Sequence, residues 1–227
     1  MRQIFAHKIF NQLLVIVFVV IVLLIGIKQK DMTLRQSLLK TLYPVVMFFG
    51  KIFPSKHAVL FNDKNIPPAI SFYQLKAIAN NGDTINFETF KGKKVLIVNT
   101  ASDCGFTRQY DELENLHLQY KDKLIILGFP ANDFKEQEKK NDADIATFCK
   151  LNYGVSFMLM KKSHVVKNGE QNEVFTWLSD ASKNGWCNQQ PVWNFSKYLI
   201  DENGILTNFF VQTVSPLNKK VIKAIGN

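Results

Sequence analysis

Nineteen consecutive uncharged residues, from Ile9 to Ile27, restrict this chain more than any other feature of its sequence. At about 1.5 Å per helical residue, such a run covers roughly 28 Å, close to the thickness of the hydrocarbon core of a bilayer. A cleaved signal peptide is the alternative, but its apolar region is about 7–15 residues long and ends at a small-x-small cleavage site. The sequence after Ile27 is Lys-Gln-Lys-Asp, with no such site. The run therefore predicts an uncleaved transmembrane anchor within residues 1–30.

The segment from Leu34 to Phe53 has the spacing of an amphipathic helix. Apolar residues recur at steps of three and four, as on one helix face, at Leu34, Leu38, Leu42, Val45, Phe49 and Phe53. Its three cations make a second membrane span costly, so we expect the helix to lie in the headgroup layer. A helix packed on a globular domain is the alternative. Pro44 should kink or divide the helix, and residues 31–70 are predicted to be this juxtamembrane helix and a linker.

The net charge of +9 is concentrated in this N-terminal third. Residues 1–70 carry a net charge of +7, whereas residues 71–227 carry only +2. The sequence does not combine basic and aromatic residues in the way that is typical of a nucleic-acid-binding surface. The cations lie beside apolar segments instead, so a lipid bilayer is the predicted partner. Cations after the apolar run outnumber those before it, which favours a cytoplasmic position for the C-terminal domain of a membrane-anchored protein.

Residues 71–227 alternate strand-like and helix-like segments. Strands are predicted at 95–100, 124–129, 157–161, 198–200 and 205–211. Helices are predicted at 107–120, 142–151, 174–181 and 216–225. This alternation predicts one layered α/β domain, in which helices flank a central sheet.

Cys104 lies between a predicted strand and a predicted helix start. Free backbone N–H groups and the positive end of a helix stabilise a thiolate, so we expect the pKa of this thiol to be lowered towards neutrality. The thiolate is both the nucleophilic and the oxidisable form of cysteine. An inert buried cysteine remains the alternative at this level of evidence.

Three sequence blocks resemble the glutathione peroxidase family. They are Asn-Thr-Ala-Ser-Asp-Cys-Gly-Phe-Thr at 99–107, Gly-Phe-Pro-Ala-Asn-Asp-Phe-Lys-Glu-Gln-Glu at 128–138, and Trp-Asn-Phe at 193–195. The blocks follow the family's order, and the similarity extends over about residues 72–217. The resemblance implies a thioredoxin-like fold with a mixed central sheet, and a peroxidase that reduces hydrogen peroxide and organic hydroperoxides at Cys104.

The resemblance also implies a catalytic tetrad, which matches Cys104, Gln137, Trp193 and Asn194. The two amides and the indole all carry N–H donors. Donors directed at one sulfur stabilise a thiolate and a developing oxyanion without adding a competing charge. Taken singly, Gln137 would be read as a loop residue, Trp193 as a core residue and Asn194 as a turn residue.

Cys149, on the predicted helix 142–151, matches the resolving cysteine of thioredoxin-dependent family members. In the implied cycle, the Cys104 sulfenic acid condenses with Cys149 to a disulfide, which an external dithiol reduces. Thioredoxin is therefore favoured over glutathione as reductant, and no cofactor is expected. A disulfide needs Cα atoms within about 7 Å, so we expect the helix to unwind partly. The alternative function is a membrane-tethered redox sensor that passes this disulfide to a partner.

Two features depart from the family pattern. Ala-Asn-Asp-Phe-Lys at 131–135 replaces the usual Cys-Asn-Gln-Phe-Gly, which removes a turn glycine and leaves the placement of Gln137 open. Phe157-Met158 replaces the usual Phe-Pro. Cys187 has no family role, and the histidines lack metal-ligand spacing, so no metal site is predicted. The short segment between Trp177 and Trp193 lacks the insertion of related tetramers, which predicts a monomer or weak dimer.

Overall fold

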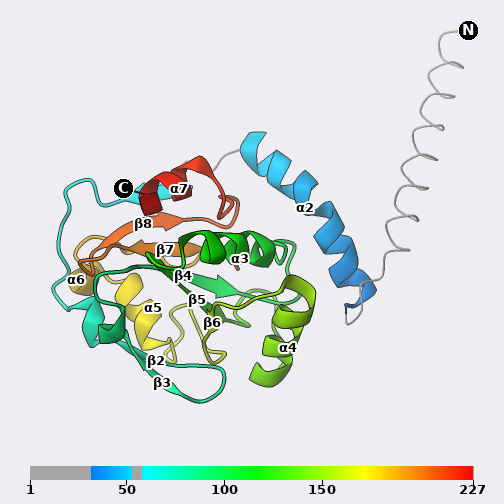
Figure 1. Ribbon diagram of the computed structural model, residues 1–227, viewed down its shortest axis with the longest axis horizontal. Helices are drawn as coiled ribbons and strands as arrows, with labels where there is room; N and C mark the ends of the chain where they lie inside the picture. Colours follow the sequence, from blue (N-terminus) through cyan, green and yellow to red (C-terminus); the bar gives the residue numbers. More distant parts are fainter. Residues whose placement is uncertain (1–31, 53–57, 227) are drawn as a thin grey trace, which may run out of the picture.

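A mixed six-stranded sheet organises the structure, a computed structural model that describes residues 32–52 and 58–226 (Figure 1). The strand order is β1-β8-β7-β4-β5-β6. The strands are β1 (Val59–Phe61), β4 (Lys94–Thr100), β5 (Leu124–Pro130), β6 (Met158–Leu159), β7 (Lys197–Ile200) and β8 (Leu206–Phe210). β4 and β5 pair in parallel, as do β5 and β6, and the other neighbours are antiparallel. Because a parallel pair is covered on both faces, every residue of β4 after Lys94 is buried.

Helices surround this sheet. They are α3 (Gln109–Tyr120), α4 (Asp142–Tyr153), α5 (Glu173–Leu178), α6 (Ala181–Asn184) and α7 (Lys219–Gly226). Two 3-10 turns, η1 (Phe72–Gln74) and η2 (Phe87–Phe90), and a hairpin of β2 (Lys76–Ile78) and β3 (Thr84–Asn86) complete the domain. The layered α/β domain predicted from the sequence is confirmed.

Both ends of α4 are capped. The Asn141 side chain accepts the N–H of Asp144 at 2.9 Å, and Gly154 closes the helix with a φ of +64°. Such a left-handed closing residue favours glycine, because a Cβ atom is strained there. The caps hold Cys149 inside a fully formed helix in the structure.

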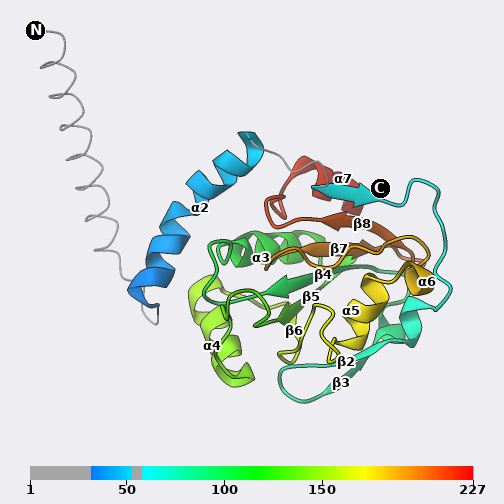
Figure 2. The ribbon, with the colours of Figure 1, turned by 180° about the vertical axis from the view of Figure 1, so that it is seen from behind.

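α2 (Leu34–Ile52) is a continuous helix that packs along the domain beside α3 and α4 (Figures 1 and 2). The helix passes through Pro44 without dividing, so of the two expected outcomes, a kink or a division, the second is wrong. The Lys40 ammonium donates to the carbonyl of Asn152 at the end of α4 (3.2 Å). The hydroxyl of Tyr43 donates to the carboxylate of Glu112 on α3 (2.9 Å). The alternative of a helix packed on the globular domain therefore describes α2.

The buried face of α2 is not the apolar stripe on which its prediction rested. The buried residues of this segment are Met32, Gln36, Ser37, Tyr43 and Met47, whereas the stripe residues Leu34, Leu38, Leu42, Val45 and Phe49 are exposed. Periodicity identifies a helix but does not say which face it buries. Here, the buried face combines Gln36 and Tyr43, which hydrogen-bond to the domain, with the apolar side chains of Met32 and Met47.

The predicted membrane-anchored localisation is corrected by the structure. Within residues 32–52 and 58–226, no helix combines the length and the apolar character needed to cross a bilayer. The run from Ile9 to Ile27, on which the transmembrane prediction depended, lies outside the described residues. The predicted anchor and the orientation that followed from it are therefore not supported, and the lipid bilayer as a partner is not tested.

Candidate active site

Cys104 lies in a tight loop that leaves the C-terminal end of β4, and its side chain is buried (1% exposed). The hydroxyl of Thr107 accepts the N–H of Cys104 at 3.0 Å, and it lies 2.7 Å from the Cys104 carbonyl and 3.0 Å from that of Ala101. The N–H of Phe106 donates to the Cys104 sulfur at 3.5 Å. Thr107 thus holds the loop in a shape that directs a backbone donor at the thiol.

Trp193 and Asn194 form a turn just before β7, which is the neighbour of β4 in the sheet. Asn99 of β4 fixes this turn, because its amide donates to the Trp193 carbonyl (3.1 Å) and its side-chain oxygen accepts the N–H of Ser196 (3.0 Å). Phe195 takes a φ of +68°, a strained value for a bulky residue. Pairing of β4 with β7 therefore brings residues some ninety positions apart in sequence to one site.

Gln137 reaches the site despite the missing turn glycine. Lys135 and Glu136 both adopt left-handed conformations, with φ of +52° and +51°. The Asn132 side chain accepts the N–H of Glu138 (2.8 Å), and the carbonyl of Gln137 accepts the N–H of Asp103 (3.0 Å). These bonds offset the backbone strain, which is typically about 1–3 kcal/mol per residue.

The four tetrad positions come together around the Cys104 thiol. The side chains of Trp193 and Asn194 both hydrogen-bond to the thiol and lower its pKa. Gln137 joins the group through Asn194, whose amide donates to the Gln137 side-chain oxygen at 3.0 Å. The structure therefore places Trp193 and Asn194 at the Cys104 thiol, and Gln137 one hydrogen bond further away.

The expected lowering of the Cys104 pKa does not appear as the net effect. Burial is the largest influence and raises the pKa, whereas the Phe106 N–H, Trp193 and Asn194 lower it, and the charge of Asp103 raises it slightly. The helix α3 begins only at Gln109, so its positive end is further from the sulfur than the sequence indicated. The donors therefore act against burial, whose effect on the pKa of the thiol is larger.

The other two cysteines are also free and buried. Cys149 on α4 is fully buried, and burial raises its pKa to about 12. Cys187 has a pKa raised by burial to about 11, and its backbone N–H and carbonyl are both bonded to the Asn184 side chain. Neither thiol is activated in this arrangement.

Three contacts of the site were not predicted from the sequence. Arg35 of α2 pairs with Asp103, which adjoins Cys104, and the Gln36 amide donates to the carbonyl of Ser102 at 3.2 Å. A helix assigned to a membrane surface gave no reason to expect either. The third contact is that of Lys197, which is fully buried and donates to the Phe195 carbonyl at 2.7 Å.

Lys197 should make the stability of the fold depend on pH. Burial lowers its pKa from 10.5 to about 7, partly offset by the charge of Glu112. Between these values the unfolded chain binds more protons than the folded chain, so the free energy of unfolding rises with pH. We expect the free energy of unfolding from urea denaturation, taken as the difference between the wild type and Lys197→Met, to rise between about pH 7 and pH 10, because the buried thiols affect both proteins alike. An identical pH dependence in both proteins would contradict this role.

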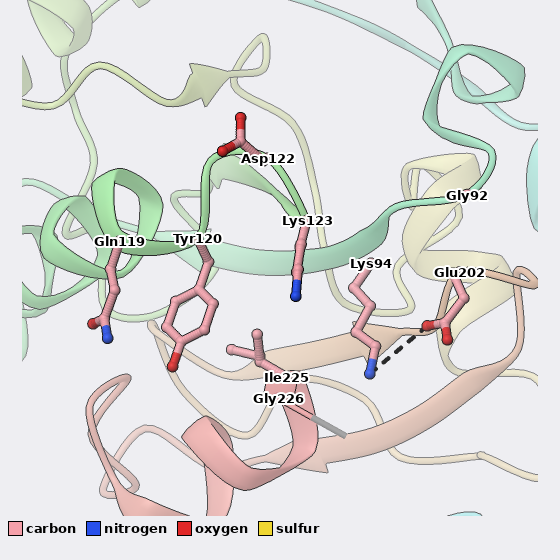
Figure 3. A pocket seen from close by; sticks show the side chains of 9 residues that line it. All are labelled: Gly92, Lys94, Gln119, Tyr120, Asp122, Lys123, Glu202, Ile225 and Gly226. Carbon is pink, nitrogen blue, oxygen red and sulfur yellow. Dashed lines mark ion pairs between the residues drawn. The ribbon is translucent and has the colours of Figure 1, made fainter.

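A pocket of about 740 Å³ lies at the other end of the sheet and is not this site (Figure 3). It lies around Lys94, where β4 begins, and is also lined by Tyr120, Lys123 and Glu202. The seven residues of β4 separate it from the Cys104 loop by roughly 20 Å. It contains no thiol. In the part of the chain that the structure describes, no three His, Cys, Asp or Glu side chains are grouped as metal ligands.

Comparison with known proteins identifies the family to which this chain belongs. The family model described as glutathione peroxidase matches residues 72–179. The chain is 46% identical over 149 residues to glutathione peroxidase-like peroxiredoxin 2 of Saccharomyces cerevisiae, covering 64% of this chain and 90% of that protein. The chain belongs to the glutathione peroxidase family. This glutathione peroxidase homologue is a thiol-dependent peroxidase, an oxidoreductase.

Further relatives agree with this assignment. The glutathione peroxidase of Lactococcus lactis is 42% identical over 149 residues, which cover 65% of this chain and 93% of that protein. The crystal structure of Trgpx in apo form has a TM-score of 0.53 and 33% identity, covering 70% of this chain and 97% of its own. A DsbF homologue from Corynebacterium diphtheriae has the same TM-score at 16% identity, covering 76% and 94%, and shares the fold alone. The thioredoxin-like fold of this glutathione peroxidase homologue is thereby confirmed.

Proposed function

We propose that Cys104 is the peroxidatic residue of this enzyme and reduces hydrogen peroxide and organic hydroperoxides. Gln137, Trp193 and Asn194 are its catalytic partners, Cys149 is the resolving cysteine, and a thioredoxin-like dithiol is the reductant. The observation that carries the proposal is the convergence of the Trp193 and Asn194 donors on the buried Cys104 thiol. A structural cysteine would not require polar donors from a separate turn.

The first step would be the attack of the Cys104 sulfur on one peroxide oxygen. The S–O bond forms as the O–O bond breaks, the thiol proton passes to the departing oxygen, and water or an alcohol leaves. The donors that lower the Cys104 pKa favour the negative sulfur needed for attack. A peroxide group is small, so the site needs a reachable sulfur and oriented donors more than a large cavity.

The second step would be the condensation of Cys149 with the Cys104 sulfenic acid. The S–S bond forms, the S–O bond of the sulfenic acid breaks, and water leaves. Because Cys149 is buried in a capped helix, α4 must open before the two sulfurs meet. The relatives named peroxiredoxins support a dithiol as reductant, because an internal disulfide is reduced by thiol–disulfide exchange.

The proposal is tested by mass spectrometry after addition of one equivalent of hydrogen peroxide to the reduced enzyme. We expect a disulfide between Cys104 and Cys149, and Cys187 as a free thiol. A disulfide that includes Cys187, or a stable sulfenic acid at Cys104 with no disulfide, would refute the proposed resolving residue.

A further inference from the structure

The start of α2 contacts the catalytic loop, residues 101–107. The Arg35 guanidinium forms an ion pair with the Asp103 carboxylate, from its Nη1 atom to Oδ2. The amide of the next residue, Gln36, donates to the backbone carbonyl of Ser102 at 3.2 Å, and Gln36 is buried. Two successive residues of one helix therefore bind two successive residues of the catalytic loop.

Other contacts fix the position of α2 independently of Arg35. Lys40 binds the end of α4, and Tyr43 binds α3. A Cβ atom placed on Gly105 of the catalytic loop would lie 3.9 Å from the Cδ2 atom of Leu39, so the two segments approach to van der Waals distance. Arg35 is therefore presented to the loop by a helix that is already docked on the domain.

Asp103 carries its charge directly beside the thiol. It precedes Cys104 in the chain, so their Cα atoms are about 3.8 Å apart across a trans peptide bond. The N–H of Asp103 donates to the carbonyl of Gln137 (3.0 Å), and its side chain is 31% exposed. In the part of the chain that the structure describes, Arg35 is its one ion-pair partner, and its buried Oδ1 atom has no hydrogen-bond partner.

A negative charge at this position opposes the chemistry proposed for Cys104. The sulfur becomes negative as it attacks a peroxide, and a neighbouring like charge disfavours the negative form. Burial is the largest cause of the raised pKa of Cys104, and the charge of Asp103 adds to it. Arg35 is not itself among the groups that shift this pKa, so any effect it has on the thiol passes through Asp103.

We propose that Arg35 is a positioning residue of the active site, which holds the Asp103 carboxylate towards α2 and neutralises it while the Cys104 sulfur becomes negative. This inference rests on the proposed peroxidatic role of Cys104. The family match covers residues 72–179 and begins after α2, so the helix is an addition to the matched domain. Through Arg35, this added helix completes the electrostatic environment of the site.

Two further charged residues adjoin the catalytic loop. Glu138, from the loop after β5, accepts the N–H and the hydroxyl of Ser102, each at 2.7 Å. Arg108 follows the catalytic loop at the start of α3 and pairs with Asp111 at 4.0 Å. Neither is among the groups that shift the pKa of the Cys104 thiol. Burial raises the pKa of Glu138, which affects the wild type and its variants alike. A difference between them therefore reports on Arg35 and its partner.

The test compares Arg35→Gln with Arg35→Lys. The reduced proteins are mixed rapidly with one equivalent of hydrogen peroxide over a range of pH, and quenched mass spectrometry follows the loss of the Cys104 thiol. We expect Arg35→Gln to slow this oxidation by about twofold to threefold at neutral pH and to raise the midpoint of its pH profile by about half a unit, the scale of a partly exposed ion pair. Arg35→Lys keeps the charge and should keep most of the wild-type rate and profile.

Asp103→Asn removes the charge on which Arg35 acts. In that background, Arg35→Gln should cause no further slowing and no further shift of the midpoint. Arg108→Gln is the matched control, because it removes the same type of cation from another ion pair beside the loop. It should leave the rate and the pH profile of Cys104 oxidation unchanged.

The outcomes separate this inference from the proposed function. A wild-type rate and profile in Arg35→Gln would overturn the inference alone, as would an equal effect of Arg108→Gln. Slower oxidation with an unchanged midpoint would overturn it in favour of a structural role, and an undiminished effect of Arg35→Gln in Asp103→Asn would show that Arg35 does not act through Asp103. A wild type whose Cys104 does not react with peroxide would overturn the proposed function as well.

Discussion

Cys104→Ser is expected to lower kcat/KM for hydrogen peroxide by about a thousandfold or more, the scale seen when an enzyme loses its nucleophile. A serine hydroxyl is far less acidic than a thiol and cannot form a sulfenic acid. The Trp193 and Asn194 donors would remain in place, but they would surround an oxygen that does not react with peroxide. Peroxide consumption in the presence of a thioredoxin-like dithiol reductant measures the effect.

The control for this prediction is Cys187→Ala. The Cys187 thiol is buried, and its backbone is held by Asn184, which the substitution leaves intact. We therefore expect peroxidase activity close to that of the wild type. Substantial peroxide turnover by Cys104→Ser would show that another group reduces peroxide, and it would remove the basis of the proposed site.

Cys149→Ser is expected to separate the two halves of the catalytic cycle. Oxidation of Cys104 by one equivalent of peroxide should proceed at nearly the wild-type rate, because Cys149 is not among the groups that shift the Cys104 pKa. Turnover with a dithiol reductant should fall by about a hundredfold, since the internal disulfide that this reductant attacks cannot form. The measurements are a single-turnover experiment and a steady-state assay on the same protein.

The same variant tests the opening of α4. The Asn141 and Gly154 caps should protect the helix from hydrogen exchange in the reduced enzyme. Oxidation should accelerate exchange across residues 142–153 in the wild type and leave it unchanged in Cys149→Ser. Unchanged exchange in the oxidised wild type would contradict the opening. Wild-type turnover by Cys149→Ser would contradict the resolving role itself.

Turnover also distinguishes the enzyme from the redox sensor that the sequence left open. An enzyme reduces many equivalents of peroxide per molecule, whereas a sensor passes on about one disulfide per partner molecule. The family relatives favour the enzyme. No feature of the described residues favours the sensor over it.

Local sequence was sufficient for most elements of the domain. The strand predicted at 95–100 is β4, and the helix predicted at 142–151 is α4, with two further residues at its end. Apolar runs and capping residues act through neighbours along the chain, so sequence alone reveals them. β1 was missed, because its three residues form a strand only by pairing with β8, about 150 residues away.

The catalytic site could be predicted only in part from the sequence. Resemblance identified Cys104, Gln137, Trp193 and Asn194 by type and order, but not how the missing glycine would be accommodated. The structure answers that question with two left-handed residues, Lys135 and Glu136, held by side-chain and backbone bonds of the surrounding loop. Such compensation involves residues that are distant in sequence and therefore leaves no local pattern.

The sequence by itself determined the reactive residue types, the order of the family blocks and most helices and strands. Only the tertiary structure decided the direction in which the pKa of Cys104 is shifted and the buried face of α2. The physical reason is the same in each case. Burial and electrostatic environment arise from the packing of segments far apart in the chain, whereas periodicity and motifs describe only neighbouring residues.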